Sequence, residues 1–138
     1  METTLVLIKP DGVRRRLVGE IVRRFEAKGL TIRAMKLMKM SGELADRHYA
    51  EHVSKGFYPE LKSFMTGGPL VALAVAGPDA VNLVRKMMGA TKPADSAPGT
   101  IRGDYALVVT ENLVHGSDSV DSANRELALW FTEADYVA

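Results

Sequence analysis

Apolar runs along the chain predict four β-strands. The runs at 5–8 and 69–77 are almost continuously apolar, which is typical of buried strands. Residues 30–40 partly alternate between apolar and polar, with a slip in phase at 34–35, and predict another strand. The stretch "YALVVT" at 105–110 predicts the last strand.

The spacing of apolar residues between these strands predicts helices. Val18, Ile21, Val22 and Phe25 recur at i, i+3, i+4 and i+7, so they share one helix face, and Gly29 suits the end of that helix. The segment 42–53 predicts a helix only weakly, because its apolar face is thin. Further helices are predicted over Pro59–Met65, Pro78–Gly89 and 122–131.

The order of these elements predicts the fold. Along the chain it is β-α-β-(α-α)-β-α-loop-β-α, and the simplest compact arrangement is a four-stranded antiparallel sheet with helices on one face. This is an α/β (α+β) architecture of the ferredoxin-like βαββαβ type, with an extra helical pair after the second strand. We expect a single domain, 1–138, because a chain of 138 residues without repeats or linkers suits one core.

One long segment fits no regular element. The sequence "ATKPADSAPGTIRGD" at 90–104 has two prolines, two glycines and no periodicity. A structureless loop of this length inside a compact domain is uncommon and tends to be functional. It carries Thr91, Lys92 and Arg102, whose donors suit a phosphate group.

Composition and charge narrow the range of functions. The net charge of +1 gives no global attraction to nucleic acid or to an anionic membrane, so any anion binding requires a local cluster of cations. The absence of cysteine excludes disulfides, thiolate nucleophiles and zinc-thiolate sites. The N-terminal residues have no basic leader and only a short apolar run, which predicts no signal peptide or membrane span, and we expect a cytoplasmic protein.

His115, within "ENLVHGSDSV" at 111–120, is the leading candidate for catalysis. A lone histidine in a connection is more often a surface or core residue, but here Gly116 allows close approach of the backbone. Glu126, on the following predicted helix, is placed to accept a hydrogen bond from one ring nitrogen. Such a carboxylate frees the other nitrogen as a nucleophile and stabilises the cation that phosphorylation creates.

Three cations and one hydroxyl are candidates for binding an anion. Lysine and arginine are usually solvated, yet Lys9 directly follows a fully apolar strand and precedes a tight turn. Arginine grips phosphate with two parallel hydrogen bonds, while lysine acts as a point charge. If Arg85, Arg102 and Thr91 converge with Lys9, the group suits a triphosphate.

The remaining aromatic and basic residues leave alternatives open. Tyr49, Phe57 and Tyr58 are either core residues or, in the turn-like "SKGFYPE", a stacking platform for a base. His48 and His52 have metal-ligand spacing on a predicted helix, but no third ligand is evident, so exposed histidines are favoured. The run of three arginines at 14–16 is typical of a solvated turn, and no glycine-rich phosphate motif is present.

Taken together, these segments resemble the nucleoside diphosphate kinase family. The resemblance extends from about Thr4 to Phe131, and its motifs occur in the family's order. They are "IKPDGV" at 8–13, "RRLVGEIVRRFEAKG" at 15–29, "PADSAPGTIRGD" at 93–104 and "NLVHGSDS" at 112–119. The resemblance implies ping-pong transfer of a γ-phosphate from a nucleoside triphosphate to a nucleoside diphosphate, through a phosphohistidine and with Mg²⁺.

The resemblance also implies roles for single residues. His115 corresponds to the phosphorylated nucleophile and Glu126 to its partner, while Ser117 supports the geometry and Asp118 approaches the metal through water. The residues expected to hold phosphates and ribose hydroxyls are Lys9, Tyr49, Arg85, Thr91, Arg102 and Asn112.

The base is expected to bind by stacking on Phe57, in a mostly apolar slot completed by Leu61 and Val109. Stacking predicts little discrimination among bases, because every base offers a π-face. The segment 54–58 departs from the family by carrying Lys55-Gly56 where many members have Arg-Pro, which leaves the detailed contacts at this point open.

Assembly and two rival functions stay open. The resemblance implies a homo-oligomer, a hexamer or a tetramer, and the short tail after 130–131 does not decide between them. One rival is a non-catalytic ferredoxin-like module that binds nucleotide or nucleic acid, which would show a steep salt dependence. Another is a phosphotransferase that uses Asp118 or Ser119 as the acceptor, which the acid stability of the phosphorylated protein distinguishes.

Overall fold

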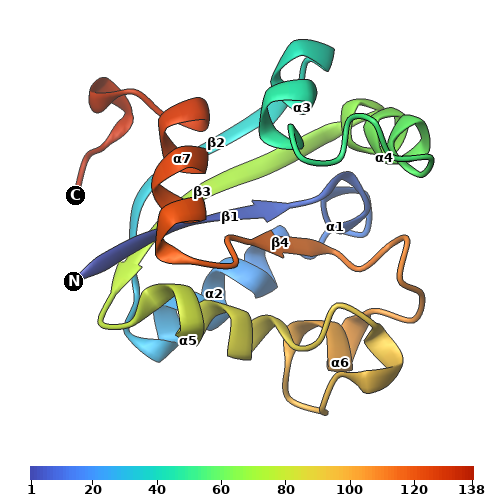
Figure 1. Ribbon diagram of the computed structural model, residues 1–138. Helices are drawn as coiled ribbons and strands as arrows, with labels where there is room; N and C mark the ends of the chain where they lie inside the picture. Colours follow the sequence, from blue (N-terminus) through green and yellow to red (C-terminus); the bar gives the residue numbers. More distant parts are fainter.

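The computed structural model describes residues 1–138 and contains one four-stranded antiparallel sheet (Figure 1). The central strands β1 and β3 pair along the whole length of β1, from Glu2↔Gly77 to Ile8↔Val71. The spatial order is β2-β3-β1-β4, so β2 and β4 are the edges of the sheet. The strands are β1 (Glu2–Ile8), β2 (Thr31–Lys39), β3 (Pro69–Gly77) and β4 (Val114–Gly116).

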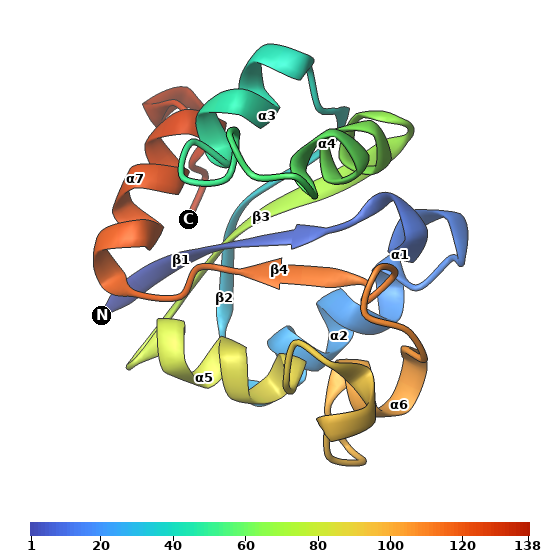
Figure 2. The ribbon, with the colours of Figure 1, turned by 45° about the vertical axis from the view of Figure 1, so that its right-hand side comes forward.

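Helices cover both faces of the sheet, not the single face that the sequence predicted. Helices α3, α4 and α7 lie on one face, and α2, α5 and α6 lie on the other (Figures 1 and 2). The helices are α1 (Pro10–Arg14), α2 (Val18–Lys28), α3 (Gly42–His48), α4 (Tyr58–Thr66), α5 (Ala80–Met88), α6 (Ile101–Tyr105) and α7 (Val120–Trp130), with 3₁₀ turns η1 (Pro93–Asp95) and η2 (Glu133–Asp135).

The apolar runs of the central strands explain this two-sided cover. Alternate residues of a strand point to opposite faces, so the run at 5–8 supplies side chains to two separate cores. Val6 and Ile8 pack with the first core, which includes residues of α2 and α5, while Leu5 and Leu7 pack with the second, which includes residues of α7. Each face therefore needs its own layer of helices.

The predicted strand at 105–110 is wrong. Residues 107–109 lie on the surface, with Leu107 91% exposed, and the only pairing in this stretch is an isolated bridge between Val108 and Glu111. The place beside β1 is taken by β4, where Leu7 pairs with His115. A short apolar run favours a strand only if a neighbour buries it, and no neighbour buries these side chains.

The other sequence expectations need smaller corrections. The loop at 90–104 is not structureless, because η1 lies within it and α6 begins at Ile101. The phase slip expected at 34–35 is a register irregularity between Ile32 and Ala34 in β2. The predicted helix end is confirmed at Gly29, whose φ of 102° is the left-handed conformation that glycine adopts without strain.

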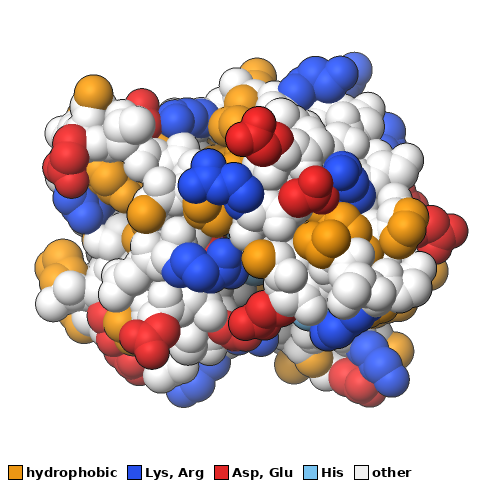
Figure 3. Space-filling view, turned by 45° about the horizontal axis from the view of Figure 1, so that its top comes forward, with side chains coloured by type: hydrophobic (Ala, Val, Ile, Leu, Met, Phe, Trp, Pro, Cys, Tyr) orange, Lys and Arg blue, Asp and Glu red, His pale blue; other side chains and the backbone are white.

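The surface shows no large patch of one charge on the face in Figure 3, where basic and acidic side chains are interspersed. This distribution agrees with the net charge of +1. None of the helices combines the length and the apolar character that a membrane span requires.

Candidate active site

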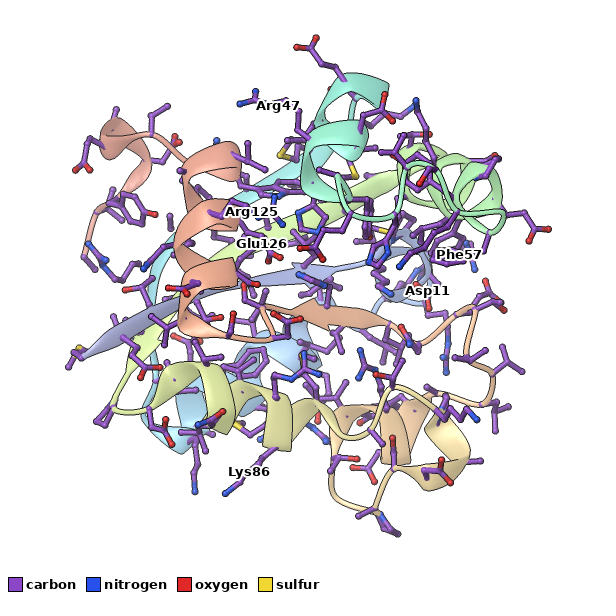
Figure 4. The ribbon with its side chains drawn as sticks, in the orientation of Figure 1. Asp11, Arg47, Phe57, Lys86, Arg125 and Glu126 are labelled. Atoms are coloured by element: carbon purple, nitrogen blue, oxygen red, sulfur yellow. The ribbon has the colours of Figure 1, made fainter.

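His115 lies in the middle of β4, the short edge strand, and its ring is held by Glu126 of α7. The Nε2 atom of His115 lies 2.9 Å from Oε1 of Glu126, and Ser117 Oγ donates to the same oxygen at 2.8 Å. The His115 side chain is 23% exposed, whereas Glu126 is almost fully buried. Figure 4 shows Glu126 on α7 with Arg125 beside it. The hydrogen bond predicted between His115 and Glu126 is present.

The charge of Glu126 is stabilised despite its burial. Burial alone would raise its pKa, but the hydrogen bond and charge of His115, the nearby His48 and the Ser117 hydroxyl together hold the pKa below its ordinary value. Glu126 is therefore a carboxylate at neutral pH. The carboxylate of Glu126 accepts a hydrogen bond from the Nε2–H of His115. The other ring nitrogen, Nδ1, therefore keeps its lone pair.

The backbone around His115 is fixed from both sides. Gly116 allows α5 to approach, because a side chain there would meet the sulfur of Met88 at 2.9 Å. Leu113 has a positive φ of 74°, which is strained for a leucine, and Asp11 Oδ2 accepts a hydrogen bond from its backbone N–H at 3.1 Å. The buried Asp11, labelled in Figure 4, thus holds the turn that leads into β4.

Lys9 and Asn112 form the next part of the site. Lys9 Nζ donates to Asn112 Oδ1 at 2.9 Å, and Asn112 Nδ2 donates to the carbonyl oxygen of Thr91 at 3.1 Å. Burial and the positive charge of Arg102 lower the pKa of Lys9 to about 8. These contacts join the end of β1, the loop after α5 and the start of β4 into one wall.

The two predicted phosphate-binding arginines, Arg85 and Arg102, contact the backbone in and around β4. Arg102 is buried and donates to the carbonyl oxygens of Asn112, Gly89 and Val114, at 3.2, 3.1 and 2.7 Å. Arg85 donates to the carbonyl oxygen of Gly116 at 3.0 Å. Burial and the neighbouring Arg85 lower the pKa of Arg102 to about 10. Both guanidinium groups thus support β4 as well as lining the site.

Most of the predicted polar residues line one cavity of about 260 Å³. Tyr49 closes one side of it, and burial raises the pKa of its hydroxyl, so this group stays protonated. Asp118 lies at the cavity with an exposed side chain, while Ser119 has a structural task, since its Oγ caps α7 at the Ser122 N–H. The predicted residues that line the cavity are Lys9, Tyr49, Arg85, Thr91, Arg102, Asn112, His115, Asp118 and Glu126.

The residues predicted to bind a base form a second cavity, of about 750 Å³. Phe57 is 53% exposed and lies just before α4, as labelled in Figure 4, and it faces this cavity with Leu61, Phe64 and Val109. The two cavities share the wall made by Lys9, Thr91 and Asn112. A polar chamber thus adjoins a more apolar slot.

Sequence reasoning missed His48. The sequence favours an exposed side chain there, but His48 is only 3% exposed, and its ring lies 4.9 Å from that of His115. The signal was its spacing of three residues from Ala45, which places both on the buried face of α3. Arg125 was missed as well. It lines the cavity and donates to the carbonyl oxygens of Arg47 and His48, which ties α7 to α3.

Comparisons with known proteins identify the family of this chain. A family model described as nucleoside diphosphate kinase matches residues 2–136. The nucleoside diphosphate kinase of Rubrobacter xylanophilus is 63% identical over 131 residues, which cover 95% of this chain and 98% of that protein. That of Thermus thermophilus is 60% identical over 131 residues, 95% of this chain and 96% of that protein.

The fold matches solved structures equally well. The structure of a halophilic nucleoside diphosphate kinase from Halobacterium salinarum in complex with CDP has a TM-score of 0.96 at 50% identity, and covers 99% of this chain and 91% of that chain. A nucleoside diphosphate kinase family protein from Babesia bovis has a TM-score of 0.98 at 44% identity, with 100% and 93% of the two chains covered. The hydrogen-bonded His115–Glu126 pair, in a cavity lined by cations, thus lies in a chain that belongs to the nucleoside diphosphate kinase family.

Proposed function

We propose that this phosphotransferase works by ping-pong transfer through a phosphohistidine at His115. The observation that carries the proposal is the 2.9 Å contact between His115 Nε2 and Glu126, which leaves Nδ1 as the nucleophilic nitrogen. The second support is the cavity, which gathers Lys9, Arg85 and Arg102 around the same ring. Nδ1 is therefore the atom that we expect to carry the phosphate.

The phosphoryl transfer takes place in two half-reactions. The lone pair of Nδ1 attacks the γ-phosphorus of a nucleoside triphosphate, the bond from phosphorus to the β,γ-bridging oxygen breaks, and the nucleoside diphosphate leaves with that electron pair. The ring keeps its proton on Nε2, and the carboxylate of Glu126 stabilises the positive charge that develops. A terminal phosphate oxygen of a second nucleoside diphosphate then attacks the phosphorus, the bond from phosphorus to Nδ1 breaks, and its electron pair returns to Nδ1, which restores neutral His115.

The surrounding residues supply position and charge, which is most of what phosphoryl transfer requires. We propose that Lys9 and the two arginines neutralise phosphate oxygens, and that Thr91, Tyr49 and Asn112 supply further hydrogen bonds to phosphate and ribose. Ser117 acts behind the nucleophile by holding Glu126.

We propose that the base binds in the apolar slot by stacking on Phe57, between Leu61 and Val109. The exposed ring presents a face that any base can cover. This arrangement supports broad base specificity, with both purine and pyrimidine nucleotides as substrates.

A Mg²⁺ ion fits the donors that the site offers. Mg²⁺ is usually bound in proteins by one or two carboxylates together with substrate phosphates and water. Asp118 is an exposed carboxylate at the cavity, whereas the carboxylate of Glu126 is already occupied by His115 and Ser117. Asp118 would hold the ion through water, and the ion would neutralise phosphate charge when bound.

We also propose a cytoplasmic homo-oligomer, either a hexamer or a tetramer. The edge strand β2 exposes Met35 and Leu37, and the loop at 107–109 exposes three further apolar side chains. Apolar side chains at a sheet edge and on a loop are suited to contacts between subunits. Light scattering in solution gives the subunit number, and fractionation of cells gives the location.

The test of the proposed function is a labelling experiment. The protein is mixed with Mg²⁺ and γ-labelled ATP without an acceptor, and is then chased with unlabelled GDP. We expect acid-labile label on the chain, discharge of that label to GTP, and no label on His115→Ala although it still folds and binds nucleotide. Acid-stable label, or exchange by His115→Ala at the normal rate, would exclude the phosphohistidine.

A further inference from the structure

His48 is a buried polar side chain at the reaction centre that the proposed mechanism does not use. It lies at the C-terminal end of α3, and its ring is 4.9 Å from that of His115 at an angle of 75°. The residue is 3% exposed, yet it lines the same cavity as His115 and Glu126. A buried imidazole beside a site for phosphate calls for a specific hydrogen-bonding state.

Trp130 of α7 fixes that state. Its indole Nε1 lies 3.0 Å from Nδ1 of His48, and the contact is buried. An indole N–H can only donate, so Nδ1 of His48 must accept and carries no proton. Burial, with smaller effects of His115 and nearby cations, lowers the pKa of His48 to about 3. His48 is therefore neutral, and its proton is on Nε2.

A metal site is the alternative use of this cluster. One nitrogen of His48, one nitrogen of His115 and an oxygen of Glu126 lie within 4.8 Å of one another, which is the spacing of a three-ligand site. A metal needs a lone pair, however, and the Trp130 hydrogen bond occupies that of Nδ1 while Nε2 bears a proton. Coordination of a metal through Nε2 of His48 would move the imidazole proton to Nδ1. The Nδ1–H of His48 would then point at the buried N–H of Trp130, and the two donors would repel each other.

We propose that His48 is a further phosphoryl-binding residue, a neutral donor whose Nε2–H bonds an oxygen of the phosphoryl group on His115, and that Trp130 is the positioning residue that fixes its tautomer. The proposal rests on the proposed function of His115. The ring centroids of His48 and His115 are 4.9 Å apart and both residues line the same cavity, so a phosphoryl group on His115 would lie beside the His48 ring.

A neutral donor suits this position because of the charges around it. Lys9, Arg125 and Glu126 all act on His48, and His115 becomes cationic during phosphorylation. A second imidazolium would oppose that cation, whereas a neutral N–H binds a phosphoryl oxygen without adding positive charge next to the ring. His48 also keeps its proton throughout, so it takes no part as an acid or base.

The first test compares two variants in single-turnover labelling with γ-labelled ATP and Mg²⁺. His48→Leu removes the donor, and we expect the rate of label transfer to His115 to fall about 10- to 100-fold, with ADP affinity within about 2-fold of normal. His48→Gln places an amide N–H where Nε2–H was, and we expect it to recover most of the rate. Equal loss in both variants, or no loss in His48→Leu, would overturn the proposal.

The second test needs no variant of His48. In protein labelled with ¹⁵N-histidine, we expect His48 to show a protonated Nε2 and an unprotonated Nδ1, and the Nε2 resonance to move when His115 is phosphorylated. Trp130→Phe is expected to yield a mixture of tautomers, whereas the packing control Phe131→Leu, also buried at the end of this helix, is expected to keep one. A protonated Nδ1 in the unaltered protein would overturn the proposal.

Two further results distinguish failure of the His48 proposal from failure of the proposed function of His115. Titration with Zn²⁺ that shifts His48 and His115 together and blocks labelling would identify the cluster as a metal site and overturn the proposal. Absence of label on His115 in the unaltered protein would overturn both this proposal and the proposed function, whereas normal labelling that is indifferent to His48 would overturn this proposal alone.

Discussion

The phosphate chamber and the base slot are built in opposite ways. In the chamber, Glu126, Arg102 and His48 are almost fully buried, and their polar atoms are held by hydrogen bonds within the protein. In the slot, Phe57 and Val109 are about half exposed and no side-chain hydrogen bond orients them. The polar groups of the chamber are therefore in place before a ligand arrives, whereas the slot offers mainly an exposed apolar surface.

This difference has a physical reason. Charge that develops on a phosphoryl group is stabilised only by donors that are already in place, because their reorganisation would add to the barrier. A base needs only an apolar face, and stacking tolerates any ring. The comparison therefore predicts large effects on rate in the chamber and smaller, uniform effects on binding in the slot.

Apart from removal of His115 itself, the largest effect is expected from Glu126→Gln, which keeps the shape of the side chain and removes its charge. We expect the rate of phosphoenzyme formation to fall about 10³-fold, because the cation on His115 loses its partner, while nucleotide affinity stays close to normal. Rapid-quench kinetics and equilibrium binding measure the two quantities. A loss confined to affinity would place Glu126 among the binding residues instead.

The same variant has an effect on stability that depends on pH. The folded pKa of Glu126 lies below its ordinary value of 4.5, so its carboxylate adds stability above about pH 4.5, and this contribution is lost as the pH falls through the folded pKa. Glu126→Gln is expected to remove that part of the acid dependence. Denaturant unfolding from about pH 3 to about pH 7 measures it.

Lys9→Met is expected to lower kcat/KM about 10²-fold, because a charged donor to phosphate is lost. It should also stabilise the protein by roughly 3 kcal/mol at neutral pH, since the folded structure lowers the pKa of Lys9 from 10.5 to about 8. The unfolded chain binds the Lys9 proton more tightly than the folded protein does. The destabilisation that charged Lys9 causes is therefore complete below about pH 8 and disappears as the pH rises towards 10.5.

The pH profile of the unaltered enzyme gives an independent check on Lys9. We expect kcat/KM to fall above about pH 8, as the free enzyme loses this charge, and Lys9→Arg to extend the plateau to higher pH. Loss of stability in Lys9→Met would mean that the hydrogen bond to Asn112 outweighs the cost of burial.

The fold and the site also differ in how far the sequence predicts them. Buried strands such as 69–77 and the helix face around Phe25 follow from the periodicity, because burial selects apolar side chains at fixed spacing. The run 105–110 misled because an apolar pattern does not reveal whether a neighbour covers it, and Leu107 stays exposed. Two-sided cover, in contrast, is consistent with the near-continuous apolar runs of β1 and β3, which bury side chains on both faces of the sheet, although the sequence analysis expected helices on one face.

In the site, motif and resemblance located the residues, but they did not reveal how each one is held. Arg102 was expected to contact phosphate, and its donors reach three backbone carbonyls as well. His48 was expected on the surface, but it is buried and accepts a hydrogen bond from Trp130, which lies 82 residues further along the chain. Contacts of this kind depend on how helices pack, which no local pattern encodes.

In the slot, Phe57→Ala is expected to raise KM about 10-fold and to leave kcat nearly unchanged, because it removes stacking without touching the chamber. The factor should be similar for ATP, GTP and CTP, and Phe57→Tyr should restore it, since it keeps the ring. Steady-state kinetics with the three nucleotides measure this. A large fall in kcat would mean that the two cavities are coupled through their shared wall.

The smallest effect is expected from Val109→Ala, which trims a side chain that is 51% exposed at the rim of the slot. We expect KM to change by no more than about 2-fold and the free energy of unfolding by less than about 0.5 kcal/mol, because exposed positions outside hydrogen-bond networks tolerate substitution. Val114→Ala, the same change in the buried strand that carries His115, is the matched control and should destabilise the protein by about 1–3 kcal/mol. Equal effects at the two positions would mean that the slot is as rigid as the chamber, and the contrast between them would no longer hold.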